Sequence, residues 1–298
     1  MLALIAGRGR LPAAVAAARD TPPLICALED FAPDGLTPEI TFRLETLGTF
    51  LLQLGNRGVT DVCLCGSIDR PSLDPNALDA ETAPLVPLLR DALAQGDDGA
   101  LRVVMDLLER TGFAIRAAHD LAPHLLPDPG VPTRRQPQQT HREDVPVALD
   151  TLAEMGRADV GQACVVKRGR VLAREGQDGT DAMLRRLTVP RDSGAPDFGP
   201  ITWSFDLAGD MIGQAADWLS NTTEDAPDAP GAGAILFKAP KPGQDRRADL
   251  PTIGPDTARR AAEAGLDGIV IEAGGVIVLE RDQVVAILDA MGMFLWIR

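Results

Sequence analysis

The sequence predicts an α/β protein with two domains. Three observations lead to this prediction: the length of the chain, the alternation of short apolar runs with helix-like segments, and a proline-rich stretch near the middle. At 298 residues the chain exceeds the roughly 100–200 residues of a typical domain. Because 45% of its residues are hydrophobic and 24% are charged, a packed core is expected and general disorder is excluded. We expect an N-terminal Rossmann-like domain with a parallel sheet and a C-terminal α/β domain, with a cleft between them.

The first half of the chain has the pattern of a parallel sheet, because predicted strands alternate with predicted helices. Residues 2–6 form a continuous apolar run that ends at Gly7, and an alanine-rich helical segment follows. A second apolar run, residues 59–65, ends at Gly66-Ser67. Expected strands cover 2–6, 24–28, 59–65 and 113–118, and expected helices cover 11–18, 45–56, 84–95 and 99–110.

Prolines and polar residues dominate positions 122–146, where we expect the chain to pass from one domain to the other. The predicted N-terminal domain therefore covers 1–133, the linker 134–146 and the C-terminal domain 147–298. Arg168-Gly169 is expected as the turn of a hairpin, and residues near 188–233 as an acidic insertion with one helix-like island at 206–219. Further expected helices cover 147–155, 182–187, 255–264 and 282–291, and further strands cover 163–167, 170–174, 234–239, 268–272, 276–279 and 293–297.

The balance of charge argues against nucleic acid as a partner. The chain has 43 acidic and 29 basic residues, a formal net charge of -14, and no segregated basic stripe. Its four cysteines lie in apolar runs and are expected as buried, reduced thiols rather than zinc ligands. The opening apolar run is shorter than the core of an export signal, and no stretch approaches the roughly 18 apolar residues of a membrane helix. We therefore expect a cytoplasmic protein.

The loop Gly7-Arg8-Gly9-Arg10 follows the first expected strand, the position of a phosphate-binding turn. Its glycines would let backbone N–H groups approach a phosphate. The full G-x-G-x-x-G pattern is absent, because Ala13 stands near the place of the third glycine and Pro12 interrupts the helix start. A tight strand-to-helix turn without a ligand explains the same residues equally well.

The segment from Lys238 to Pro255 carries the densest set of groups suited to phosphate chemistry. It begins where an expected strand ends and finishes where a helix begins, which is where α/β sheets present ligands. Its lysines and arginines suit phosphate oxygens, while Asp245 and Asp249 suit magnesium or a bound water. Prolines and a glycine stiffen the loop. A solvated charged loop is the alternative interpretation.

Other polar groups follow expected strands or begin expected helices. Gly179-Thr180-Asp181 and Gly96-Asp97-Asp98 suit ligand contacts, although a helix N-cap explains each of them as well. Glu175 and Glu272 stand at strand ends, where a carboxylate can face a cleft. Thr133-Arg134-Arg135 suits a phosphate held between domains, or is simply solvated.

Several familiar catalytic patterns are absent from the sequence. The histidines at positions 119, 124 and 141 lack a metal-binding helical spacing. Neither the G-x-S-x-G pattern of serine hydrolases nor a Walker A lysine motif occurs. The common nucleophilic, zinc and P-loop mechanisms are therefore not expected.

The chain resembles the LpxI-type UDP-2,3-diacylglucosamine pyrophosphatases over nearly its whole length. Five segments, taken together and in chain order, carry the resemblance: residues 4–12, 96–98, 133–135, 179–181 and 238–255. The resemblance implies two α/β domains that enclose a lipid between them. It also implies magnesium-dependent hydrolysis of UDP-2,3-diacylglucosamine to UMP and 2,3-diacylglucosamine 1-phosphate, with water attacking the nucleoside-side phosphorus. Residues 188–233 depart from this resemblance, because they are longer and more acidic than the short connection expected there.

The resemblance implies roles for individual residues. Phosphoryl transfer depends on positioning and charge stabilisation more than on a protein nucleophile. We expect Asp249 first, together with Asp245 and Asp181, to hold Mg²⁺ and position the attacking water. The expected catalytic residues are Asp249, Asp245, Lys238, Lys241 and Arg246, and the expected substrate-binding residues are Gly7, Gly9, Arg10, Leu11, Gly66, Asp97, Asp98, Thr133, Arg134, Lys167, Glu175, Thr180, Asp181, Thr252 and Glu272.

The implied partners are an acylated UDP-sugar and, through its acyl chains, the cytoplasmic face of the inner membrane. Burying these chains in an apolar groove gains about 0.8 kcal/mol per CH₂ group. A homodimer is proposed without a specific sequence signal. Two other classes stay open: a Rossmann-type enzyme acting on nucleotide sugars or transferring hydride, and a non-catalytic lipid- or nucleotide-binding protein. Cofactor difference spectra distinguish a Rossmann-type enzyme from a hydrolase. Accumulation of UMP distinguishes a hydrolase from a non-catalytic binding protein, which would bind its ligand without releasing UMP.

Overall fold

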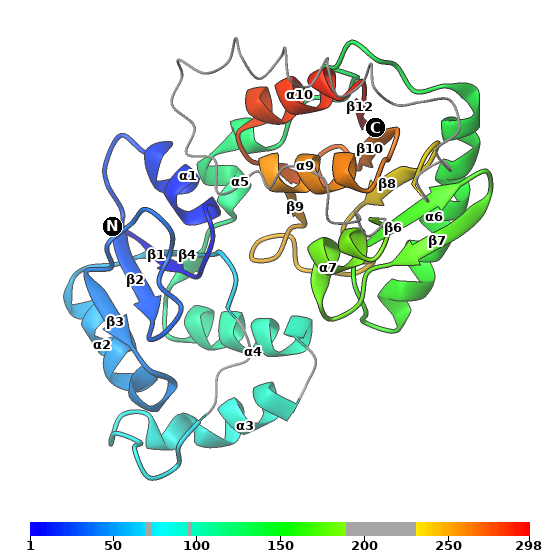
Figure 1. Ribbon diagram of the computed structural model, residues 1–298. Helices are drawn as coiled ribbons and strands as arrows, with labels where there is room; N and C mark the ends of the chain where they lie inside the picture. Colours follow the sequence, from blue (N-terminus) through cyan, green and yellow to red (C-terminus); the bar gives the residue numbers. More distant parts are fainter. Residues whose placement is uncertain (69–72, 95–96, 189–230) are drawn as a thin grey trace, which may run out of the picture. The chain divides into compact units, whose positions relative to one another are not determined.

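The computed structural model describes residues 1–68, 73–94, 97–188 and 231–298 (Figure 1). The helix expected at 206–219 lies outside these residues. The chain forms two compact units, each assembled from three segments. Unit 1 comprises Met1–Pro127, Pro240–Thr252 and Gly274–Leu279, and unit 2 comprises Asp128–Ala239, Ile253–Ala273 and Glu280–Arg298.

Unit 1 is built on a five-stranded sheet with the order β3-β2-β1-β4-β5, in which all neighbouring strands are parallel. Parallel sheets are normally covered on both faces, which explains why β1, β2 and β4 are continuous apolar runs. The α/β fold class with an N-terminal parallel sheet is therefore confirmed. The strands are β1 (Leu2–Ala6), β2 (Leu24–Leu28), β3 (Ile40–Phe42), β4 (Asp61–Cys65) and β5 (Ala114–Ile115).

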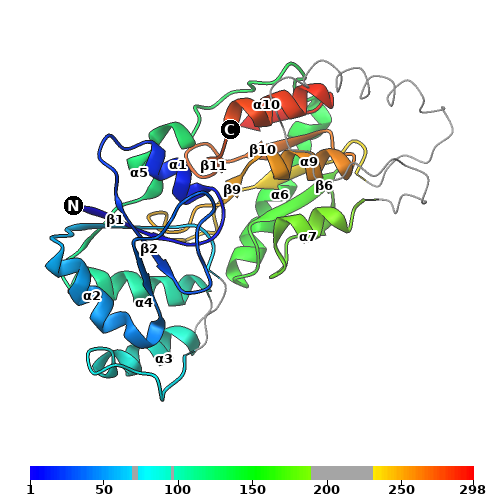
Figure 2. The ribbon, with the colours of Figure 1, turned by 60° about the vertical axis from the view of Figure 1, so that its left-hand side comes forward.

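Successive residues of each strand in unit 1 enter opposite layers of its core, as the alternation of strand side chains requires. Ile5 belongs to the apolar cluster that contains side chains of α2, α3 and α4, whereas Leu4 belongs to the cluster that contains side chains of α1 and α5. Figure 2 shows these two groups of helices on opposite sides of the sheet. The helices are α1 (Leu11–Ala17), α2 (Leu47–Asn56), α3 (Val86–Ala94), α4 (Asp97–Arg110) and α5 (Ala118–Leu121), with 3₁₀ turns at Leu44–Thr46, Ala83–Leu85 and Pro123–Leu125.

Two strands of unit 1 differ from the sequence prediction. The strand expected at 113–118 is only Ala114–Ile115, because Ala118 already begins α5. The edge strand β3 was not predicted, since Ile40–Phe42 is too short to show a repeating pattern. Both differences concern sheet edges, where few residues pair.

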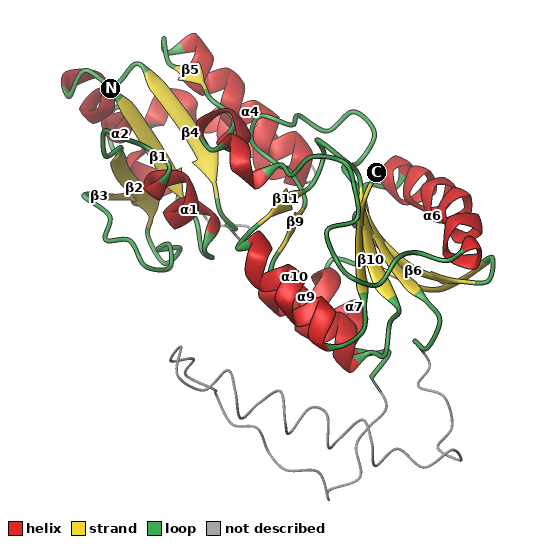
Figure 3. Ribbon diagram, turned by 90° about the horizontal axis from the view of Figure 1, so that it is seen from above, coloured by secondary structure: helices red, strands yellow, loops and turns green. Residues whose placement is uncertain are grey.

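Unit 2 contains a mixed five-stranded sheet with the order β12-β10-β8-β6-β7 (Figure 1). Strands β12, β10 and β8 are parallel, β6 runs antiparallel to β8, and β7 runs antiparallel to β6. Helix α6 covers one face, whereas α7, α9 and α10 lie on the other (Figure 3). The elements are α6 (Gln139–Arg157), β6 (Ala163–Lys167), β7 (Arg170–Arg174), α7 (Gly179–Arg185), β8 (Ile235–Lys238), α9 (Pro255–Glu263), β10 (Gly268–Ile271), α10 (Arg281–Ala290) and β12 (Phe294–Ile297).

The boundaries of the units differ from the expected domains at 1–133 and 147–298. Residues 130–133 are fastened to β12, where Gly130 and Ile297 exchange backbone hydrogen bonds of 2.9 Å and the Leu295 amide donates to Thr133 Oγ1 at 3.0 Å. Residues 139–146, expected as part of the linker, form the start of α6. Residues 130–133 and 139–146 therefore belong to unit 2.

Unit 1 also takes two segments from the second half of the chain. The side chains of Leu250 and Ile277 join its apolar cluster, which contains Leu4 and Val15. The short strands β9 (Thr252–Ile253) and β11 (Ile277–Val278) pair with each other in a separate two-stranded sheet. Apolar residues far apart in sequence thus draw these segments into unit 1.

The hairpin predicted at Arg168-Gly169 is confirmed between β6 and β7. Both turn residues have positive φ, 49° and 75°, as a two-residue turn between antiparallel strands favours. The carboxylate of Asp144 on α6 accepts hydrogen bonds from the backbone N–H groups of Arg168 at 3.0 Å and Gly169 at 2.5 Å. The side chain of Asp144 is buried, so it fixes the hairpin against α6.

Replacing Asp144 with alanine is expected to lower the free energy of unfolding by about 2–3 kcal/mol, because two backbone amides lose a buried, charged acceptor. Urea unfolding followed by circular dichroism measures this change. The exposed Asp150 on the same helix supplies the control, since Asp150→Ala should change stability by less than about 0.5 kcal/mol. Equal effects of the two substitutions would contradict the role given to Asp144.

The four cysteines, Cys26, Cys63, Cys65 and Cys164, are buried and free of disulfides, as the sequence predicted. Burial raises the pKa of the Cys26 and Cys164 thiols to about 12. These thiols are therefore packing groups at neutral pH. Among the described residues, none of the helices is long and apolar enough to span a bilayer.

Candidate functional site

The loops that follow β1 and β4 meet at the carboxyl edge of the unit 1 sheet. The Gly7 amide donates to Cys65 O at 2.8 Å, and Arg8 and Ser67 exchange backbone hydrogen bonds of 2.8 and 3.0 Å. The helix after β1 packs on one face of the sheet, whereas α3 and α4 after β4 pack on the other. The β1–β4 pair is therefore a topological switch point, where open α/β sheets bind ligands.

Glycine is required where these two loops touch. A Cβ atom on Gly7 would lie 2.5 Å from Ser67 O, and one on Gly66 would lie 2.5 Å from Gly7 O. Gly66 also has a φ of 93°, which side chains disfavour. The structure thus brings together Gly7 and Gly66, two residues expected at the substrate site.

The remaining residues of the first loop have distinct surroundings. Gly9 has a φ of 91°, and no atom lies within 4 Å of the place that a Cβ atom would take, so the loop has room for a ligand on that side. Arg10 is exposed and precedes α1, whereas Leu11 packs against the apolar cluster of unit 1. Arg8 donates to Asp30 O at 2.9 Å. Leu11 is therefore a packing residue that positions the loop.

The segment from Lys238 to Pro255, which the sequence indicated as the main site, is divided between the two units. Lys238 and Ala239 belong to unit 2, residues 240–252 belong to unit 1, and Ile253 returns the chain to unit 2. Residues 240–252 are called the crossover loop below. The expected catalytic residues Lys241, Asp245, Arg246 and Asp249 and the expected substrate-binding residue Thr252 all lie in it.

Gln244 organises the crossover loop from inside. Its side chain is 9% exposed, its Oε1 accepts from the Lys241 amide at 2.9 Å, and its Nε2 donates to Asp249 Oδ2. The Asp249 amide donates to Asp245 O at 3.3 Å, which places the two aspartates in one turn. Sequence reasoning missed Gln244, whose only signal was an uncharged amide in a charged loop.

Helix α4 braces the same loop within unit 1. Arg102 Nη2 donates to Gly243 O at 2.5 Å, and the Arg247 guanidinium lies 2.6 Å from Glu109 Oε1 and 2.8 Å from Asp245 Oδ2. The hydrogen bond from Arg247 holds the pKa of Asp245 below its usual range, although burial acts in the opposite direction. Neither Arg102 nor Glu109 was predicted, because their contacts join segments far apart in the chain.

The pKa of Asp245 predicts a pH dependence. A carboxylate with a lowered folded-state pKa contributes stability that is present above its unfolded pKa of about 3.9 and is lost as pH falls through the folded value. The stability difference between the wild type and Arg247→Gln should therefore be constant near neutral pH and narrow as pH falls from about 5 to about 3. Urea unfolding across this range measures it.

Arg110→Gln is the matched control for Arg247→Gln. Arg110 forms an exposed ion pair of 3.4 Å with Asp106 on α4, and such pairs contribute little. Its stability difference from the wild type should be small at every pH. A difference for Arg247→Gln that widens on acidification would contradict the assignment.

A second group of predicted residues gathers at the edge of the unit 2 sheet where β7, β8 and β10 end. Lys238 Nζ donates to Thr180 Oγ1 at 2.9 Å, and the Thr180 hydroxyl donates to Glu175 Oε1 at 2.5 Å. The Glu272 amide donates to Lys238 O at 3.2 Å, so the next strand end lies beside them. Lys167 does not join this group, because β6 is antiparallel to β8 and carries it to the opposite edge.

Of the expected magnesium ligands, Asp245 and Asp249 lie in one turn of the crossover loop in unit 1. Asp181 belongs to unit 2, where its Oδ2 lies 2.9 Å from Arg260 Nε, a distance of an ion pair without hydrogen-bond alignment. Within the described ranges, no group of three or more His, Cys, Asp or Glu is arranged to hold a metal. Since Mg²⁺ commonly takes one or two carboxylates together with substrate phosphates, Asp249 and Asp245 on one loop still fit such a site.

Some of the other residues expected to contact the substrate make hydrogen bonds within the protein instead. Thr133 is buried and accepts from the Leu295 amide, whereas the side chain of Arg134 is 88% exposed and lies 3.7 Å from Asp289. The backbone of Asp97 and Asp98 begins α4, but their side chains lie outside what the structure describes, as does Gly96. Thr252 Oγ1 donates to Leu250 O at 3.3 Å in the crossover loop.

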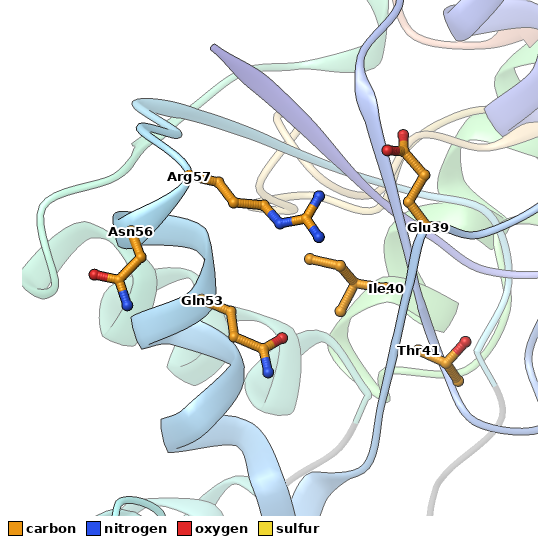
Figure 4. A pocket seen from close by; sticks show the side chains of 6 residues that line it. All are labelled: Glu39, Ile40, Thr41, Gln53, Asn56 and Arg57. Atoms are coloured by element: carbon orange, nitrogen blue, oxygen red, sulfur yellow. The ribbon is translucent and has the colours of Figure 1, made fainter.

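A surface depression of about 420 Å³ in unit 1 is lined by none of the residues expected at the site (Figure 4). Glu39, Ile40 and Thr41 line it from the start of β3, and Gln53, Asn56 and Arg57 line it from the end of α2. These segments meet at the amino edge of the parallel sheet, opposite the loops that follow β1 and β4, which we call the glycine loops. We give the depression no role in phosphate chemistry, because α/β sheets bind such ligands at the carboxyl edge.

The fold and the site together define a two-unit α/β protein with a Rossmann-like first unit, glycine loops at its switch point and a braced polar crossover loop. The family model of the LpxI N-terminal domain matches residues 1–125, and the family model of the LpxI C-terminal domain matches residues 128–198 and 209–296. The chain is also 37% identical over 298 residues to the UDP-2,3-diacylglucosamine pyrophosphatase LpxI of Caulobacter vibrioides, covering 98% of this chain and 95% of that protein. The chain belongs to the LpxI family.

Family membership confirms the resemblance found in the sequence. The two family domains meet between residues 125 and 128, close to the first boundary between units 1 and 2 at 127/128. The unmatched residues 199–208 fall inside the acidic stretch that departs from the resemblance.

Proposed function

We propose that this protein hydrolyses the pyrophosphate of UDP-2,3-diacylglucosamine, releasing UMP and 2,3-diacylglucosamine 1-phosphate in lipid A biosynthesis. The observation that carries the proposal is the 37% identity, over 98% of the chain, to a protein named for this pyrophosphatase activity. The site suits the reaction, because the crossover loop presents carboxylates and cations on a rigid frame. Cleavage of a pyrophosphate needs such positioned charges more than a protein nucleophile.

Each group of residues has a proposed role. The backbone of Gly7, Gly9 and Gly66 approaches the nucleotide, with Arg10 beside it. Lys241 and Arg246 from the crossover loop, Lys238 from β8 and Arg134 offset negative charge on the pyrophosphate. Further proposed contacts to the substrate come from Asp97, Asp98, Thr252 and Glu272.

We propose that the reaction depends on Mg²⁺ and that Asp249 is its principal ligand. Asp245 and Asp181 are secondary candidates. Bound Mg²⁺ supplies charge neutralisation for phosphate oxygens. Gln244 then orients the Asp249 carboxylate, and Asp249 orients the attacking water.

The proposed chemistry forms one bond and breaks one. The oxygen of water bonds to the nucleoside-side phosphorus, the bond from that phosphorus to the bridging oxygen breaks, and the sugar 1-phosphate leaves with the bridging oxygen. The protons of the attacking water pass to the solvent. Hydrolysis in oxygen-18 water with Mg²⁺, analysed by mass spectrometry, should place the label in UMP. Label in the sugar phosphate would reject this direction of attack, and binding of substrate without UMP release would indicate a binding protein.

Removing Mg²⁺ with EDTA is expected to abolish UMP release, and adding Mg²⁺ back is expected to restore it. A second readout is independent of turnover, because Mg²⁺ titrated into the protein with UMP should shift its unfolding temperature upward. Turnover that persists after complete chelation would reject the cofactor.

The acylated substrate implies further proposals about location and assembly. We propose that the protein works in the cytoplasm at the inner-membrane face, which it reaches through the acyl chains of its substrate or product. The expected test is binding to vesicles that contain the diacylated substrate and not to vesicles without it. A homodimer is proposed as well, and light scattering of the purified protein tests it.

A further inference from the structure

Three buried polar side chains form a continuous hydrogen-bonded chain at one edge of the unit 2 sheet. Glu175, Thr180 and Lys238 are 7%, 8% and 7% exposed. Lys238 Nζ donates to Thr180 Oγ1 at 2.9 Å, and Thr180 in turn donates to Glu175 Oε1 at 2.5 Å. We call these three hydrogen-bonded side chains, Glu175, Thr180 and Lys238, the lysine relay. Burying an ammonium and a carboxylate costs free energy, which hydrogen bonds only partly offset, so the arrangement requires an explanation.

The glutamate at the end of the lysine relay is held rigidly. Its second oxygen, Oε2, accepts from the Gln162 amide at 2.6 Å, and its own amide donates to Ala163 O at 2.9 Å. Gly161 packs so closely that a Cβ atom there would lie 2.4 Å from Glu175 O. Both oxygens of Glu175 are thus occupied, and the carboxylate fixes the direction of the Thr180 hydroxyl.

Lys238 ends the lysine relay, although nearly all of the basic residues of this protein are arginines. Only Lys167, Lys238 and Lys241 are lysines among 29 basic residues, and two of these three flank the entry to the crossover loop. An ammonium is a compact donor that matches a single hydroxyl, whereas a guanidinium suits flat, bidentate acceptors. The backbone of Lys238 is fixed too, because its carbonyl accepts from the Glu272 amide at 3.2 Å.

We propose that Glu175 and Thr180 are positioning residues that hold the Lys238 ammonium for the pyrophosphate, and that neither contacts the substrate itself. This inference rests on the proposed function and changes the role expected for both residues. Their burial and mutual hydrogen bond leave little surface for a ligand. The glutamate orients the threonine, the threonine orients the lysine, and only the lysine meets phosphate charge.

The first test observes the lysine directly. In protein labelled with ¹⁵N at lysine Nζ, the wild type can give at most three ammonium signals, and Lys238→Arg identifies that of Lys238. Thr180→Val keeps the shape of the side chain and removes the hydroxyl, so it should raise the exchange rate of the Lys238 ammonium with water about tenfold or more. Thr180→Ser should leave this rate close to that of the wild type.

The second test measures steady-state kinetics of UMP release. Thr180→Val should lower kcat by about 10- to 100-fold while KM changes less than about threefold, and Thr180→Ser should recover most of the loss. Thr151→Val is the matched control, because Thr151 is equally buried in unit 2 and its hydroxyl donates only to Val147 O, at 2.7 Å. This control should retain near wild-type kcat and the Lys238 signal, even where it lowers the unfolding temperature.

The outcomes separate the lysine relay from the proposed function. Unchanged exchange of the Lys238 ammonium in Thr180→Val would overturn the relay, and changed exchange with wild-type kcat would overturn its part in the reaction. Wild-type protein that releases no UMP would overturn the proposed function and this role with it. The ammonium signals would still decide whether Thr180 holds Lys238.

Discussion

Replacing Asp249 with asparagine is expected to lower kcat for UMP release by about 100- to 1,000-fold, the usual loss when a principal charge-stabilising group is removed from an active site. The side chain keeps its shape, so the Gln244 contact and the fold of the crossover loop should survive. The negative charge proposed for Mg²⁺ and for the attacking water disappears. Steady-state assays at several Mg²⁺ concentrations measure the effect, and higher Mg²⁺ should recover only part of it.

The matched control is Asp106→Asn, the same chemical change in the same unit. Asp106 is exposed on α4 and forms only a surface ion pair with Arg110, so its loss should leave kcat within about twofold. Unfolding temperatures of both variants show whether each protein is folded. Near-normal turnover by a folded Asp249→Asn protein would remove Asp249 from the proposed mechanism.

Gln244→Ala tests how much of the effect of Asp249 depends on its position. The amide of Gln244 bridges the Lys241 backbone and the Asp249 carboxylate. Without it the carboxylate remains but loses its orientation, so we expect a smaller loss of kcat, about 10- to 100-fold. A larger loss than that of Asp249→Asn would mean that Gln244 itself meets the substrate.

Local patterns in the sequence were enough to predict most of the regular structure. The apolar runs at 2–6 and 24–28 depend only on neighbours in the chain, and they became β1 and β2. The hairpin at Arg168-Gly169 followed from the same local logic. Gly7 and Gly66 could both be noted at strand ends, but their direct approach required knowing that β1 and β4 are neighbours.

The candidate site was harder to predict, because its contacts are long-range. The crossover loop stood out by composition, yet the bracing by Arg102 and Glu109 joins positions more than a hundred residues apart. The division of 238–255 between two units is equally invisible, since it depends on Leu250 packing in a distant apolar cluster. Burial of Glu175 and Thr180 changed these residues from proposed substrate contacts to positioning groups.

Replacing Gly66 with alanine is expected to destabilise unit 1 by about 2–5 kcal/mol. Two costs combine: a residue with a side chain must adopt a φ of 93°, at about 1–2 kcal/mol, and its Cβ would lie 2.5 Å from Gly7 O. The clashing atoms are backbone atoms of the neighbouring loop, so no side chain can turn away. Hydrogen exchange measured by mass spectrometry should show faster exchange in β1 and β4, with β8 and β10 of unit 2 less affected.

Gly9→Ala separates the two costs, because Gly9 has nearly the same φ, 91°, but no atom within 4 Å of the added Cβ. It should lose only about 1–2 kcal/mol, and the difference between the variants measures the contact between the two glycine loops. Both variants should also raise KM for the UDP-sugar, because the backbone of Gly9 and that of Gly66 are both proposed to approach the nucleotide. Equal stability of the two variants would mean that the loops separate easily, and the switch point would then be too loose to hold a phosphate in one position.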